Sequence, residues 1–105
     1  MNYQIREMCP EDFDAVLALW RVTEHIDLNE CDTPEGIAVY LKRNPGLSFV
    51  AEAGSAFAGV VLCGHDGRRG FLRHLAVAKE YRKQGMARAL VERALQGLLQ
   101  HPGPN

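Results

Sequence analysis

The chain has 105 residues, of which 47% are hydrophobic and 24% are charged, and its formal net charge at pH 7 is −1. This length fits one small domain over residues 1–105, and a near-neutral charge gives no global sign of a nucleic-acid partner. The N-terminus lacks the apolar core of a signal peptide and no apolar run approaches the roughly 20 residues that span a membrane, so we expect no membrane partner.

The first half of the chain predicts one strand and then two helices. Residues 3–7 alternate as a strand does, and residues 9–24 carry apolar side chains at helical spacing. Residues 25–32 have no clear period and predict a loop. A second helix is expected from a cap at Thr33 until just before Pro45, because proline disfavours helical backbone at the preceding residue. The core-facing stripe of the first helix is Phe13, Val16, Leu17 and Trp20.

The second half predicts three strands joined by tight turns. Residues 47–53 and 57–65 form one expected hairpin, and the Asp66-Gly67 turn leads to a strand over residues 71–77. Hairpin connections favour a mostly antiparallel sheet of about four strands. With three helices packed on it, the predicted class is α+β.

A final helix is expected to begin near Gln84 and to end before residues 101–105, which read as a tail because prolines cannot continue a helix. Its apolar residues at helical spacing indicate the face that packs on the sheet. That predicted buried face is Ala87, Leu90, Val91, Ala94, Leu95 and Leu98.

The junction between the last strand and this helix reads "HLAVAKEYRKQGMARAL". A helix start leaves unpaired N–H groups and partial positive charge, which together favour an anion. Gly85 permits positive φ and a close ligand, Ala87 adds little bulk and Met86 is expected to turn away. Arg82, Lys83 and Arg88 add charge, so two adjacent phosphates fit, although a basic loop in which glycine only makes the bend fits as well.

The same segment resembles motif A of the GNAT superfamily of acyl-CoA-dependent N-acyltransferases, [R/Q]-x-x-G-x-[G/A]. Arg82, Gly85 and Ala87 fall on that motif, with Tyr81 as the preceding aromatic residue. The segments "EDFDAVLALW", "FVAEAGSAFAGVVLCG" and "GFLRHLAV" resemble the first helix and the second to fourth strands of that fold. The likeness therefore covers most of the chain.

This resemblance implies that acetyl-CoA is the cosubstrate. The backbone N–H groups of Gln84, Gly85, Met86 and Ala87 are expected to hold its pyrophosphate. The strand edge formed by Leu75, Ala76 and Val77 is expected to pair with the pantetheine arm. The Val77 N–H is expected to stabilise the oxyanion.

The resemblance also implies direct attack by an amine, so Cys63 is read as a core residue and not as a nucleophile. His74 is the candidate catalytic base, because its ordinary pKa suits the task and its strand leads to the thioester. A lone strand histidine also fits a purely structural role, and Glu52 on a neighbouring strand is a second candidate. The three cysteines, Cys9, Cys31 and Cys63, form no metal-ligand or C-x-x-C pattern, so we expect reduced thiols, a cytoplasmic location and no metal.

The resemblance also predicts that several elements of the family fold are missing. After the helix that follows motif A, members of the family usually continue with a strand, a helix and two more strands. Without them the strand over residues 71–77 is an open edge, and open edges seek partners. We expect a homodimer in which each copy covers the other; a sequence that is a piece of a longer protein is the alternative.

The predicted function is transfer of an acetyl group to a primary amine on a small molecule, peptide or protein. Residues 1–50 hold nine acidic and four basic residues, and the acidic loop over residues 24–32 is able to draw a cationic acceptor. The alternative is a non-catalytic CoA-binding or protein-interaction module derived from the same fold. A nucleic-acid partner is not expected, because the basic residues gather near one loop with few aromatics between them.

Overall fold

The structure is a computed structural model that describes residues 3–100, so the expected tail at 101–105 lies outside the described residues. Strands and helices follow the expected order. In chain order they are β1 (Gln4–Glu7), α1 (Phe13–Arg21), α2 (Pro34–Arg43), β2 (Phe49–Ala53), β3 (Ala56–His65), β4 (Gly70–Val77) and α3 (Met86–Gln100), with 3-10 turns at Pro10–Asp12 and Lys79–Tyr81.

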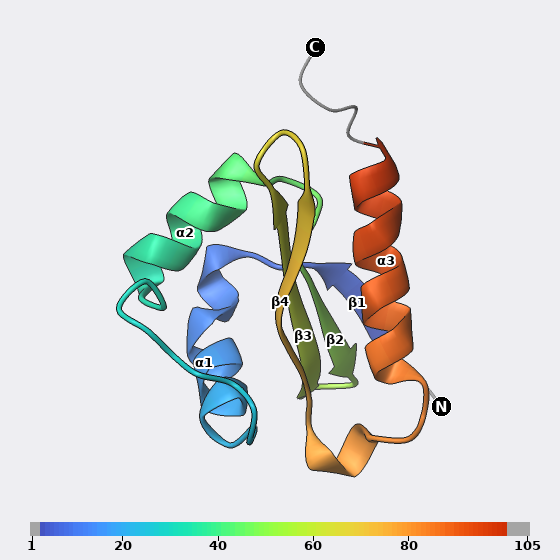
Figure 1. Cartoon of the computed structure of the whole chain (residues 1–105). Coiled ribbons are helices and arrows are strands. Elements are labelled where there is room, and N and C mark those ends of the chain that lie inside the picture. The colour runs from blue at the N-terminus through green and yellow to red at the C-terminus, as the bar shows by residue number, and fades with distance from the viewer. Residues whose placement is uncertain (1–2, 101–105) are drawn as a thin grey trace.

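The four strands form one sheet in the order β1-β2-β3-β4, and every neighbouring pair is antiparallel. Helices α1 and α2 cover one face of this sheet and α3 covers the other (Figure 1). The predicted α+β class is therefore confirmed for residues 3–100. No helix of this described part is long and apolar enough to cross a membrane.

The helix starts follow from local capping. The Thr33 side chain accepts a hydrogen bond from the Gly36 N–H at 3.0 Å, as expected for a cap. The first helix is shorter than predicted, because Pro10–Asp12 is a separate 3-10 turn in which an Asp12 carboxylate oxygen accepts from the Cys9 N–H at 2.8 Å. The Arg6 guanidinium donates to the Asp12 carboxylate and holds its pKa below the ordinary value.

The prediction for the buried face of α3 was partly wrong. Ala87 is exposed and Leu95 is 45% exposed, whereas Gly97 is buried. A methyl group added at Gly97 would lie 2.5 Å from the Gly46 carbonyl oxygen, so the helix rotates this small residue toward the loop before β2. The face that packs on the sheet is Met86, Leu90, Ala94 and Gly97.

Strand β4 contains a β-bulge that the sequence did not reveal. Arg73 pairs with Leu62 and Ala76 pairs with Val60, so two residues of β4 lie opposite one residue of β3. His74, the first of those two, has φ +52, a left-handed conformation that is uncommon for a non-glycine residue. The bulge shifts the alternation of side chains along β4. This shift determines which β4 side chains line the two cavities described below.

Candidate functional site

The start of α3 leaves backbone donors available for a ligand. The first hydrogen bond into the helix runs from the Ala89 N–H to the Gly85 carbonyl at 3.0 Å. The amides from Gln84 to Ala87 precede this bond, and among residues 3–100 no side chain accepts from them. Consecutive free N–H groups at the positive end of a 15-residue helix form a ready anion site.

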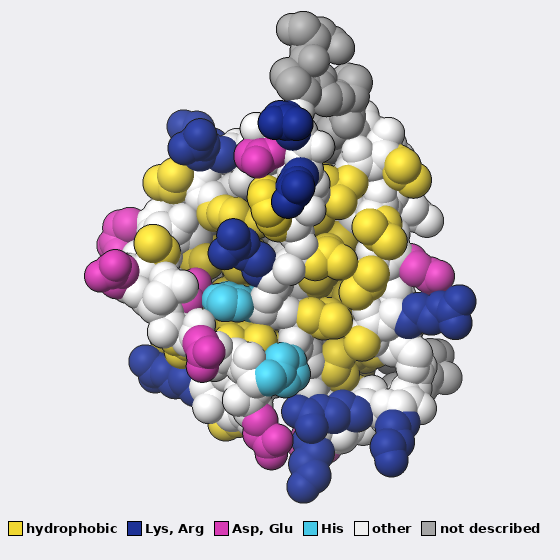
Figure 2. All heavy atoms as spheres, viewed as in Figure 1, with side chains coloured by type: hydrophobic (Ala, Val, Ile, Leu, Met, Phe, Trp, Pro, Cys, Tyr) yellow, Lys and Arg dark blue, Asp and Glu magenta, His cyan; other side chains and the backbone are white. Residues whose placement is uncertain are grey.

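The backbone around Gly85 is open toward that site. Gly85 has φ +81 and Lys83 has φ +63, and no atom lies within 4 Å of the position a Cβ would take at Gly85. Met86 turns its side chain into the core, as expected, and is 1% exposed. Figure 2 shows Lys and Arg side chains gathered around the junction of β4 and α3. The sequence places four exposed basic residues there, Lys79, Arg82, Lys83 and Arg88.

Two of these basic side chains have partners within the protein. The Arg82 Nε donates to the Val77 carbonyl at 3.0 Å, which folds the side chain back onto the end of β4. Arg88 lies 3.4 Å from the Glu92 carboxylate on the next turn of α3, in a pair that is largely exposed. An exposed pair of this kind is weak, so Arg88 remains able to turn toward an anion.

The outer edge of β4, which pairs with no other strand of residues 3–100, leads directly to this junction. The Ala78 N–H donates to the Ala58 carbonyl at 2.7 Å, and Ala76 lies opposite Val60. Successive residues of a strand direct their backbone polar groups to opposite edges. The backbone groups of Ala76 therefore face β3, and the Val77 N–H points away from the sheet. Of the three edge residues proposed from the sequence, Leu75 and Val77 therefore present backbone groups to a ligand and Ala76 does not.

A cavity of about 230 Å³ joins the edge of β4 to the start of α3. We call it the junction groove. Leu75 and Val77 form one wall, Arg82 and Ala87 the second, and the segment after α1 the third. The third wall consists of Thr23, Glu24 and His25.

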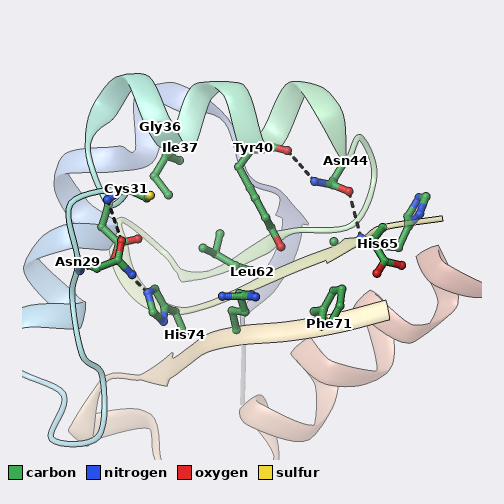
Figure 3. A pocket seen from close by; sticks show the side chains of 14 residues that line it. Asn29, Cys31, Gly36, Ile37, Tyr40, Asn44, Leu62, His65, Phe71 and His74 are labelled. Carbon is green, nitrogen blue, oxygen red and sulfur yellow. Dashed lines mark hydrogen bonds and ion pairs between the residues drawn. The ribbon is translucent and has the colours of Figure 1, made fainter. Parts of the chain in front are cut away.

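A second cavity, of about 310 Å³, lies between α2 and the strands β3 and β4 (Figure 3). We call it the α2 pocket. Its side chains come from the loop before α2, from α2 itself and from β3 and β4. Tyr40 reaches down from α2 into the cavity toward the strands (Figure 3). Its lining includes Asn29, Cys31, Asp32, Ile37, Tyr40, Asn44, Leu62, Asp66, Phe71, Arg73 and His74.

His74 lines the α2 pocket, and the next residue of β4, Leu75, lines the junction groove. Its Nε2 is 3.2 Å from an Asp32 carboxylate oxygen, and its ring packs edge-on against Trp20 with centroids 4.8 Å apart. The Trp20 Nε1 donates to the His74 carbonyl at 3.1 Å, which holds the bulge in place. If the proton is on Nε2, Asp32 accepts this hydrogen bond and Nδ1 keeps its lone pair.

The other candidates from the sequence lie elsewhere. Glu52 is on β2, separated from β4 by β3, and it accepts from the Arg6 Nε at 2.7 Å, so it is not available as a base at this site. Cys63 is fully buried in the core beneath α3, and burial raises the pKa of its thiol. The prediction that Cys63 is a core residue is therefore confirmed.

Sequence reasoning placed Asp32 only in the acidic loop and missed its contact with His74, which is 42 residues away. It assigned Trp20 to the core alone and gave Arg73 no role in a site. No local spacing connects these residues. Alternation along β4 places Arg73 and His74 on opposite faces of the sheet, and the bulge overturns that expectation.

The comparisons with known proteins point to one family. A sequence model described as the acetyltransferase (GNAT) family matches residues 5–103. The chain is 39% identical over 92 residues to an acetyltransferase of Yersinia pestis (strain Pestoides F), covering 86% of this chain and 63% of that protein. It is 38% identical to an acetyltransferase of Pectobacterium atrosepticum, with the same coverage. The chain thus spans just under two thirds of the length of these relatives.

Solved structures agree on the fold. Diaminobutyrate acetyltransferase from Paenibacillus lautus, solved in complex with its substrate L-2,4-diaminobutyric acid and coenzyme A, is 27% identical with a TM-score of 0.73. That match covers 95% of this chain and 58% of the solved one. The loading GNATL domain of CurA from Lyngbya majuscula is 18% identical with a TM-score of 0.76, over 98% of this chain and 61% of that one.

Proposed function

The chain belongs to the GNAT family of acetyltransferases, and from that premise we propose that it transfers an acetyl group from acetyl-CoA to a primary amine by direct attack. The observation that carries this proposal is that His74 lines the α2 pocket while the next residue of β4, Leu75, lines the junction groove. A base at this position faces the proposed acceptor pocket and is one residue from the strand edge proposed to hold the cosubstrate.

The junction groove and the adjoining start of α3 fit the cosubstrate. The free amides from Gln84 to Ala87, with open space at Gly85, suit a pyrophosphate, and Lys83, Arg82 and Arg88 add positive charge beside it. The outward-facing polar groups of Leu75 suit an amide-containing arm laid along β4 as an added strand. The Val77 N–H is a fixed donor for the negative charge that develops on a carbonyl oxygen.

His74 is the catalytic base of this proposal. A free alkyl amine is protonated near pH 7, because its pKa is about 10.4, so a proton must leave before attack. The Nδ1 lone pair of His74 takes that proton, directly or through one water, while Asp32 at 3.2 Å stabilises the resulting imidazolium. Asp32 acts through His74 and is a positioning residue.

Bound acetyl-CoA supplies an activated acetyl thioester, and the transfer forms a C–N bond as the C–S bond breaks. A protonated amine loses two protons in this transfer: His74 accepts the first before attack, and the second leaves the nitrogen as the amide forms and reaches the departing thiolate through solvent, so one proton is released overall. Amine and thioester thus become amide and thiol, with no change of oxidation state. No covalent link to the chain is required, which agrees with the burial of Cys63.

The acceptor in this proposal is a small molecule. A cavity near 300 Å³ is at the lower end of the range for small-ligand sites. The similar Paenibacillus lautus enzyme, whose substrate is L-2,4-diaminobutyric acid, supports a small amine as the class to try first.

The test combines binding and turnover. Acetyl-CoA at 100 times its Kd should stabilise the folded chain by about 2.7 kcal/mol, and a panel of small primary amines should release free thiol. Stabilisation without thiol release on any amine would leave the chain as a non-catalytic CoA-binding module. An unchanged melting temperature with acetyl-CoA would reject both roles.

We also propose that the chain forms a homodimer through the region between β4 and α3. Figure 2 shows hydrophobic side chains in a band there, beside the free edge of β4. Leu72 is 42% exposed on β4, and Leu99 is 86% exposed on α3. Sedimentation should give twice the mass of the chain at micromolar concentration, whereas a folded monomer at that concentration would reject the dimer.

A further inference from the structure

The bulge in β4 brings two consecutive side chains into one cavity. In a regular strand, neighbouring residues face opposite sides of the sheet. Arg73 and His74 nevertheless both line the α2 pocket, because His74 has φ +52 and occupies the bulge. The pocket therefore presents a base and a guanidinium side by side.

Arg73 forms no salt bridge with any carboxylate of residues 3–100. Its guanidinium carbon lies 5.6 Å from the centroid of the Phe71 ring. Burial raises the pKa of Tyr40 in the same pocket, and the charge of Arg73 opposes that rise. Stacking on a ring holds the guanidinium plane and leaves its N–H groups free for a ligand.

The acidic side chains of the same pocket already have partners. Asp32 accepts from His74 and from the Asn29 N–H, which is 3.0 Å away. One Asp66 carboxylate oxygen accepts from the N–H groups of Arg68 and Arg69, both at 2.8 Å. These hydrogen bonds orient the two carboxylates, whereas Arg73 is an arginine of the lining that pairs with no carboxylate of residues 3–100. A planar guanidinium matches a carboxylate in geometry.

We propose that the α2 pocket takes a small acceptor that carries a carboxylate beside its primary amine, with Arg73 as the partner of the carboxylate. This rests on the proposed acetyl transfer, because the amine must lie at His74. Ile37, Leu62 and Tyr40 give the pocket apolar walls that suit a short carbon chain between the two groups. The exposed acidic side chains of the loop before α2 draw the ammonium end, and Arg73 selects for the carboxylate end.

The test compares acceptors that differ only in the carboxylate. Three amino acids, L-2,4-diaminobutyrate, L-ornithine and L-lysine, are each paired with the diamine left by removing that group, and thiol release gives kcat/KM for all six. We expect the wild type to favour the amino acid of at least one pair by about 10- to 100-fold, the range of one charge-assisted contact. Arg73→Gln should bring that ratio close to one.

Arg68→Gln is the matched control, because Arg68 is an exposed arginine of the β3–β4 turn that does not line the pocket. It should keep the wild-type ratio. A wild-type ratio near one in every pair, or a preference that survives Arg73→Gln, overturns the inference while leaving acetyl transfer intact.

A binding measurement keeps the inference testable if no amine turns over. The Nγ-acetyl form of L-2,4-diaminobutyrate and N-acetyl-1,3-diaminopropane are titrated into the ¹⁵N-labelled chain, and amide shifts of the α2 pocket are followed by NMR. Saturable shifts with the carboxylate compound alone, lost in Arg73→Gln, support the inference. Equal shifts with both compounds, or none with either, overturn it; the acetyl-transfer proposal fails separately, by absence of thiol release.

Discussion

Strand β4 lines both the junction groove and the α2 pocket, but different kinds of chemical group form the two sites. The cosubstrate site proposed at the junction groove and the adjoining start of α3 depends on main-chain groups, namely the amides at the start of α3 and the outward-facing N–H of Val77. Side chains from α2, the preceding loop, β3 and β4 define the pocket. Backbone donors bind the cosubstrate, which is the same for many proteins. Side chains, in contrast, are free to differ from one protein to another according to the acceptor. Changes in one cavity should therefore leave the other working.

The largest expected difference between the two sites follows from a change at His74, which lines the α2 pocket but not the junction groove. His74→Asn keeps a residue that tolerates positive φ and removes the base. We expect kcat to fall by about 10²- to 10⁴-fold, as for loss of a general base, with acetyl-CoA affinity within about twofold of wild type. Steady-state thiol release and calorimetric titration measure the two quantities. An unchanged kcat would remove His74 from catalysis.

Chemical modification of Cys31 should block acceptor binding in the α2 pocket and leave acetyl-CoA binding intact. Cys31 is exposed and lines the α2 pocket, whereas the equally exposed Cys9 lies outside it. Alkylation with iodoacetamide in a Cys9→Ser background should lower acceptor kcat/KM by about tenfold or more, because the adduct occupies acceptor space. Acetyl-CoA binding should persist, and alkylation of Cys9 in a Cys31→Ser background is the matched control. Equal losses of acceptor and acetyl-CoA binding would show that the cavities are not independent.

Asp32→Asn should have a smaller effect on the same step. The amide keeps an acceptor for the His74 Nε2–H but loses the charge that stabilises the imidazolium. We expect kcat to fall by about tenfold while KM for acetyl-CoA stays constant, since a charged hydrogen bond contributes roughly 1.5–3 kcal/mol and only part of it is lost. A rise in KM for acetyl-CoA with constant kcat would assign Asp32 a purely structural role.

The smallest effect is expected at Cys63, which belongs to neither cavity. Burial raises the pKa of this thiol, so the reactive thiolate is scarcer at neutral pH than for an exposed cysteine. Cys63→Ala should keep kcat/KM within about twofold, because direct transfer needs no nucleophilic cysteine. Mass spectrometry of a brief alkylation should find Cys63 unmodified in the folded chain. Loss of turnover in Cys63→Ala with a retained fold would require a covalent step.

The candidate anion site at the start of α3 could be proposed from the sequence because its residues form one contiguous stretch, whereas the third wall of the junction groove comes from Thr23, Glu24 and His25, far away in the chain. Neighbouring positions in the sequence show Gly85, the basic residues beside it and the helix start. The hairpin turns separately indicate the antiparallel order of the strands. The same local rules located β2, β3 and β4 and the Thr33 cap. They failed for the buried face of α3, where the close approach of Gly97 to the Gly46 loop rotates the helix.

The pocket could not be predicted in the same way. Asp32 meets His74 across 42 residues, and the contact depends on how the loop before α2 packs over β4. Arg73 shares a cavity with its neighbour only because of the bulge, and period-two alternation predicts the opposite. A non-glycine residue at positive φ is a tertiary outcome, set here by the bond from Trp20 to the His74 carbonyl.

The most direct measurement compares acetyl-CoA binding by Gly85→Glu and Gly46→Glu. Both glycines have positive φ, +81 and +77, with no atom within 4 Å of an added Cβ, so the two variants share backbone strain and added charge. Gly46 packs beside Gly97 late in α3, away from the start of that helix. With acetyl-CoA at 100 times the wild-type Kd, wild type and Gly46→Glu should each gain about 2.7 kcal/mol and Gly85→Glu should gain almost nothing. Equal stabilisation of both variants would contradict the assignment of the junction groove to the pyrophosphate.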